Sequence, residues 1–183
     1  LVPLFVIASG EKKYLGFVVG FVAGIVQFYT VSDIVASYSG GHSAMEYIIP
    51  YGLKLFMAIK IGIFALVFSY SQSLRSPQRV HLSIIQSLFV ASALVLWDFA
   101  LNLALDGLPL LESPIGAALA SCNSAAQWAE FGGVFALSFL VVLVNSLLAL
   151  SIIRKSRSIA TVALGLVVSV YSLGYFRAES FET

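Results

Sequence analysis

Charge is what this sequence most lacks. Only 10% of its 183 residues are charged and 60% are hydrophobic, whereas soluble domains have roughly 25% and 45–50%. The net charge is +1, so no broad positive field is available to attract nucleic acid. The composition predicts an integral membrane protein that has membrane lipids as partners and does not bind nucleic acid.

Cysteine and histidine are also scarce. Because Cys122 is the single cysteine, an internal disulfide framework and a thiolate metal cage are excluded. Cys122 is expected to be a small interfacial residue or a lipidation site. His42 and His81 fall in a loop and at a helix margin, where they cannot clamp a haem within the membrane.

Motifs that carry known chemistry are missing too. The sequence contains no HExxH, GxSxG, P-loop or GxGxxG pattern. We therefore predict no catalytic, metal-binding or cofactor-binding residues and a protein that is not an enzyme. No cofactor is predicted, but the protein could still bind lipids, or a pigment if it is part of an energy-transducing complex.

Long apolar runs dominate what is present. Each is long enough for a transmembrane helix, which needs roughly 20 residues. We predict a single membrane domain over 1–183, an all-α bundle of five transmembrane helices with short loops, or of four if the last helix only dips into the membrane. The predicted spans are 14–33, 48–70, 82–105, 131–153 and 158–176.

The longest predicted connection, Asp106 to Glu130, contains an alanine- and serine-rich stretch from Ile115 to Trp128 that could form a short interfacial helix. The chain opens at Leu1 instead of methionine. The run from Leu1 to Ala8 is too short to span and could be the end of a longer segment.

Basic residues fall on alternate connections. They precede the first span and follow the second and fourth spans, whereas the intervening loops carry acidic side chains but no lysine or arginine. By the positive-inside rule, the N-terminus lies on the cytoplasm-like side. With five spans the C-terminus lies on the opposite side, and the sequence does not indicate which membrane is involved.

Two lysines interrupt the second span. A charged side chain at the centre of a bilayer costs about 2.5–3.5 kcal/mol on insertion scales, so Lys54 and Lys60 should face protein, water or a partner. Counting about 1.5 Å per residue places Lys54 and Asp98 at a similar depth, roughly 10 Å below one face. We predict that these two residues form an intramembrane ion pair.

Asn145 is estimated to lie close to the depth of Lys60 and is a possible partner for it. Asn102 and Asn145 are expected to form hydrogen bonds between helices. The ion pair is either structural, with Lys60 extending toward lipid headgroups, or part of a transport path.

Three glycines recur at every fourth position of the first span. Gly16, Gly20 and Gly24 would form a smooth stripe on one side of a helix, which lets another backbone approach closely. We predict that this stripe is a helix-packing interface.

A further indication comes from the segment from Phe131 to Arg157, preceded by Ser121, Cys122 and Trp128, and from Phe64 to Leu74. These segments resemble the last loop and final helix, and the end of the second helix, of MARVEL-type tetraspan proteins, including the Casparian-strip-like proteins. The resemblance implies a non-enzymatic protein that organises membranes by oligomerising, with Asp98 as the aspartate of its third helix. The sequence departs from that family in having no arginine in helix one, no second loop cysteine and a fifth span.

The function predicted from these features is association. The chain would be an accessory subunit of a larger membrane complex or a self-assembling scaffold, binding other subunits or copies of itself. The alternative is a small transporter or channel that uses Lys54, Lys60 and Asp98, and a membrane enzyme ranks third.

Overall fold

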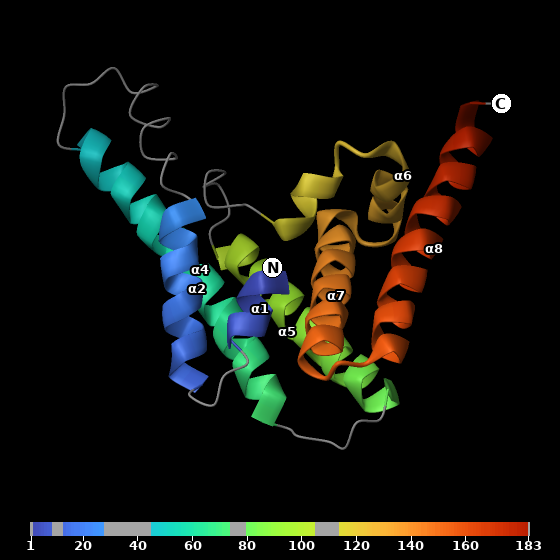
Figure 1. The fold of residues 1–183 in the computed structure, drawn as a ribbon. Coiled ribbons are helices and arrows are strands. Elements are labelled where there is room, and N and C mark those ends of the chain that lie inside the picture. The colour runs from blue at the N-terminus through green and yellow to red at the C-terminus, as the bar shows by residue number, and fades with distance from the viewer. Residues whose placement is uncertain (1, 9–12, 28–44, 74–79, 105–113, 183) are drawn as a thin grey trace. The chain divides into compact units, whose positions relative to one another are not determined.

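The computed structural model describes residues 2–8, 13–27, 45–73, 80–104 and 114–182, and every one of the regular elements in these ranges is a helix (Figure 1). The predicted all-α class is confirmed. The elements are α1 (Val2–Ala8), α2 (Lys13–Gln27), α4 (Met45–Ser73), α5 (Val80–Ala104), η1 (Ile115–Leu119), α6 (Asn123–Ala126), η2 (Gln127–Phe131), α7 (Gly133–Ile153) and α8 (Arg157–Glu182).

Four of these helices, α4, α5, α7 and α8, are long and apolar enough to cross a membrane, and α2 is a shorter apolar helix. At about 1.5 Å per residue, the 21 residues of α7 extend about 32 Å, close to the roughly 30 Å hydrocarbon core of a bilayer. The predicted helical membrane bundle is therefore confirmed. The span count and the orientation stay predictions.

The observed helices begin and end at somewhat different residues from the predicted spans. The span predicted at 158–176 is part of α8, which continues to Glu182. The polar residues that follow the apolar run stay helical, and an apolar pattern cannot predict that extension. The run predicted at 14–33 corresponds to α2, and its final part lies outside the described residues. The stretch predicted as one interfacial helix forms three short helical segments, η1, α6 and η2.

The chain divides into two compact units, one formed by residues 3–74 and the other by residues 75–183 with residues 1–2. In the first unit, α2 packs against α4 through its glycines. A side-chain carbon added at Gly20 would lie 2.7 Å from the Ile61 carbonyl oxygen, and one added at Gly24 would lie 2.6 Å from the Ala58 α-carbon. Such spacing is possible only because glycine has no side chain.

The first unit has a second contact of a different kind. The ring of Phe5 in α1 stacks on the ring of Phe68 in α4, with centroids 4.3 Å apart, and both side chains are fully buried. Gly16 completes the stripe on α2, because an added carbon there would meet the hydroxyl of Ser69. The predicted packing glycines thus face α4 within this unit.

In the second unit, α5 and α7 run antiparallel. The guanidinium of Arg154, just after α7, reaches Ser83 near the start of α5, while the ring of Phe99 near the other end of α5 contacts Phe135 in α7 at 5.4 Å. Between these contacts lie buried apolar side chains from both helices, which form the core of the unit: Val90, Ala91, Leu94, Leu137, Val142 and Leu147.

A tight turn joins α7 to α8. The backbone N–H of Ser156 donates to the carbonyl of Ser151, and that of Lys155 donates to the carbonyl of Ile152. Lys155 has a φ of +49°, so these bonds form a Schellman motif with a lysine where glycine is usual. The turn returns the chain alongside α7 as α8 (Figure 1).

Candidate functional site

The two lysines of α4 lie in the first unit. Lys54 is half-buried, whereas Lys60 is only 6% exposed. Burial of a charged amine in an apolar helix requires compensating polar groups or a partner. The side chain of Lys60 is therefore surrounded by protein atoms and does not face lipid.

The polar residues of α5 and α7 lie in the second unit. Asp98 is only 5% exposed and belongs to the buried face of α5, and Asn102 is half-buried one turn further on. The amide nitrogen of Asn145 donates to the carbonyl of Val141 in its own helix at 2.7 Å. Because the lysines belong to the other unit, the pairings of Lys54 with Asp98 and of Lys60 with Asn145 stay predictions.

α7 contains three buried serines, at different angles around the helix, that the sequence analysis missed. Ser138, Ser146 and Ser151 are nearly inaccessible, and each hydroxyl donates to a carbonyl three or four residues earlier in the helix. Ser138 also accepts a bond from the backbone N–H of Gly116 in η1, at 2.8 Å. These bonds satisfy the hydroxyls within the helix, so the small serines permit close packing without an unsatisfied polar group.

Arg154 forms a polar link between α7 and α5. Its guanidinium donates to the Ser83 hydroxyl at 2.6 Å and to the side-chain carbonyl oxygen of Gln86 at 2.7 Å, and both partners are buried. Partial burial lowers the pKa of Arg154, because desolvation disfavours the charged form. A guanidinium nevertheless stays protonated, so Arg154 is a permanently charged link between the two helices.

A groove lies between η2 and α8. It has a volume of about 240 Å³ and combines aromatic and aliphatic walls with one cationic side chain. Its lining residues are Gln127, Trp128, Phe131, Leu173, Gly174 and Arg177.

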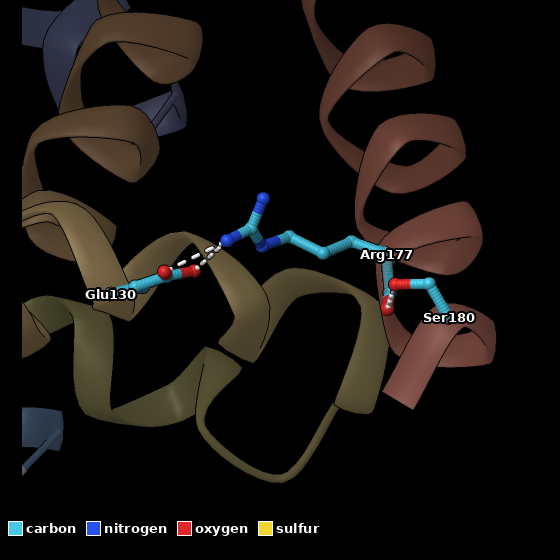
Figure 2. Close-up of polar contacts among 3 residues, drawn as sticks. All are labelled: Glu130, Arg177 and Ser180. Atoms are coloured by element: carbon cyan, nitrogen blue, oxygen red, sulfur yellow. Dashed lines mark hydrogen bonds and ion pairs between the residues drawn. The ribbon is translucent and has the colours of Figure 1, made fainter. Parts of the chain in front are cut away.

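Two contacts fix the geometry of this groove. The indole Nε1 of Trp128 donates to the carbonyl of Val170 in α8 at 2.9 Å. The guanidinium of Arg177 extends from α8 to the carboxylate of Glu130 on η2, with nitrogen–oxygen distances of 2.6 and 2.7 Å (Figure 2). These side chains are 44% and 53% exposed, so the pair can also be reached from the surroundings.

The sequence held a signal for this site that was not used. Glu130 precedes the fourth predicted span and Arg177 follows the fifth, and two helices joined by a short turn bring those outer ends together. Opposite charges at the two ends of a helical hairpin therefore predict an ion pair. The groove itself could not be read from the sequence, because it depends on how η2 folds back toward α8.

The remaining chemistry-bearing residues add little. His81 is exposed at the start of α5 and Cys122 is half-buried before α6, whereas His42 lies outside the described residues. Across the described ranges, no group of three or more histidine, cysteine, aspartate or glutamate side chains is arranged to hold a metal ion.

The helices and their polar links define the class of the molecule as a polytopic helical membrane protein. Residues 1–147 match the model of the apolipoprotein N-acyltransferase N-terminal domain. The chain therefore belongs to the apolipoprotein N-acyltransferase N-terminal domain family. No curated protein and no solved structure matches it.

This finding overturns three of our predictions. The resemblance to MARVEL-type tetraspans is wrong, and so is the expectation of a non-catalytic accessory subunit or scaffold, because the matching family is one of acyltransferases. The prediction that the chain is not an enzyme is wrong for the same reason. The error arose because membrane helices draw on few residue types, so short apolar segments of unrelated families look alike.

Proposed function

We propose that this chain supplies membrane-embedded helices of an N-acyltransferase that modifies a lipoprotein. The family match over residues 1–147 is the observation that carries the proposal. The four long apolar helices support it, because they would hold the protein in the membrane in which lipidated substrates reside.

The reaction defines what such helices must do. The amine of the lipoprotein attacks the ester carbonyl of a phospholipid, a carbon–nitrogen bond forms and the carbon–oxygen bond of the ester breaks. The proton leaves the amine and ends on the oxygen of the departing lysophospholipid. Both substrates are amphiphiles, so holding them at one depth and in one orientation would contribute much of the rate enhancement.

The second unit suits this positioning role. The link from Arg154 to α5 and the bond from Trp128 to α8 give it fixed interhelical geometry. The apolar side chains that α8 leaves exposed offer a surface for acyl chains, and they include Leu164, Val168, Leu173 and Phe176. Membrane lipids are the partners that this surface favours.

The orientation in the membrane is part of the proposal. The basic turn from Arg154 to Arg157 would face the cytoplasm-like side, as the positive-inside rule favours. The end of the hairpin that carries Glu130 and Arg177 would then face the opposite side. The predicted pair of Lys54 and Asp98 would brace the spans, and neither residue is assigned a chemical step.

Depletion of the protein in cells of the organism that encodes it tests the proposal. Mass spectrometry of purified lipoproteins should show loss of the N-linked acyl chain and accumulation of forms with a free N-terminal amine. Re-expression of the gene should restore the acylated form. Lipoproteins that keep their N-acyl chain after depletion would rule the proposal out.

A further inference from the structure

One buried hydroxyl of α5 has no hydrogen-bond partner in the described part of the chain. The side chain of Ser87 is 0% exposed, and its oxygen bonds to no described atom. Leaving a buried hydroxyl unbonded is costly, so native proteins almost always satisfy it with a protein group or an ordered water molecule. Ser87 therefore marks a position where a polar partner is needed.

The buried serines of α7 show how a hydroxyl is satisfied by its own helix. Ser138, Ser146 and Ser151 each donate to a carbonyl three or four residues earlier. Carbonyls lie at the same spacing in every helix, but the oxygen of Ser87 forms no such bond with the described residues of α5. Its hydroxyl is therefore available to a group outside the backbone of α5.

The surroundings of Ser87 on α5 are polar. Ser83 lies one turn earlier on the same buried face, and Gln86 is the preceding residue; both accept a bond from Arg154. Residues four positions apart on a helix have β-carbons about 5–6 Å apart. A water molecule bonded to two hydroxyls bridges up to about 5.5 Å, since each contact is about 2.7–2.8 Å. One water therefore fits between the hydroxyls of Ser83 and Ser87.

Arg154 can supply a third bond at this position. A guanidinium has five N–H groups, and the described bonds of Arg154 to Ser83 and Gln86 use two of them. A buried water makes about three hydrogen bonds, and two hydroxyls with one guanidinium N–H provide that number. An acyl chain does not suit the position, because both serines are 0% exposed and polar.

We propose that one ordered water molecule is bound on α5 beside Arg154. It accepts bonds from the Ser87 hydroxyl and from the Arg154 guanidinium, and it donates to the Ser83 oxygen. The water extends the link between α7 and α5 by one helical turn. This inference does not depend on the acyl-transfer proposal, because stability and structure are measured without turnover.

The direction of the Ser87→Ala effect tests the proposal. With a bound water, the substitution removes one of its partners and should lower the midpoint of thermal unfolding in detergent by about 2–4 °C, the shift expected for one hydrogen bond in a protein of this size. With an unsatisfied hydroxyl, alanine would raise the midpoint, because it removes the buried polar group and favours the helix. A raised or unchanged midpoint would overturn the proposal.

Ser146→Ala is the matched control, because Ser146 is also 0% exposed but donates within α7 to the Leu143 carbonyl. In Arg154→Gln the water loses its guanidinium partner, so the loss caused by Ser87→Ala should shrink at least roughly twofold. The effect of Ser146→Ala should be the same with and without Arg154→Gln. An equal loss from Ser87→Ala in both backgrounds would count against the bridge.

An experimental structure of the unsubstituted protein, at a resolution that shows ordered water, gives a readout that does not require the variants to fold. Density about 2.7–3.2 Å from the Ser87 oxygen, also within bonding distance of Ser83 and Arg154, is the expected result. A Ser87 hydroxyl bonded to a carbonyl of α5, with no such density beside it, would overturn the assignment.

Discussion

Adding one methyl group at Gly20 should separate α2 from α4. In Gly20→Ala the new carbon would lie 2.7 Å from the Ile61 carbonyl oxygen and 2.8 Å from the Ala65 β-carbon, whereas favourable contacts between carbons need about 3.5–4.0 Å. The helices would have to move apart by roughly 1 Å. Overpacking of this kind costs about 1–3 kcal/mol, and the higher helix propensity of alanine returns up to about 1 kcal/mol.

Gly52→Ala is the matched control, because the same change in α4 of the same unit meets no described atom within 4 Å. It should stabilise the protein by about 0.5–1 kcal/mol through helix propensity alone. Denaturant unfolding in detergent, followed by circular dichroism, compares the two variants. The Gly20 variant should be less stable than the Gly52 variant by about 1–3 kcal/mol, and equal stabilities would refute the argument that the stripe sets the distance between the helices.

Other predictions concern the second unit. Lys155→Gly should raise the free energy of unfolding by about 0.5–1 kcal/mol, because glycine adopts a positive φ without strain. Arg157→Gly in α8 is the control and should lower it. Denaturant unfolding of both variants shows whether each change stabilises or destabilises the protein. Arg154→Gln should lower the midpoint of thermal unfolding, since it removes bonds to two buried side chains that are worth about 1.5–3 kcal/mol each. Trp128→Phe keeps an aromatic wall but loses the bond to α8, and should cost about 0.5–1.5 kcal/mol in the same assay. Cysteines placed at Lys155 and Glu182 should react with an impermeant reagent from opposite sides of the membrane, and labelling from one side would contradict a spanning α8.

The fold class could be predicted because lipid solvation imposes a strong pattern. Apolar runs of about 20 residues must be helical, since every backbone polar group has to be bonded within its own segment. The glycine spacing on α2 likewise indicated a face for close packing. Helix ends were less predictable, because the last turns of α8 are polar and lie outside the pattern that lipid imposes.

The candidate site was less predictable for a physical reason. Depth estimates treat each helix separately, so they suggested Lys54 and Asp98 as partners but carried no information on which helix faces which. Arg154 was assigned only to a basic loop, because its bonds to α5 depend on a side chain that extends back from the turn. Tertiary contacts of this kind join residues about 70 positions apart, and no local sequence pattern encodes them.

The turn between α7 and α8 also bears on how the protein is made. Only three residues, Arg154 to Ser156, separate the two helices, and three residues reach at most about 11 Å. The start of α8 therefore cannot leave the membrane surface at which α7 ends. In the proposed topology, in which both helices span the membrane, α8 takes the reverse direction to α7, so a single orientation step during insertion would determine the topology of both helices.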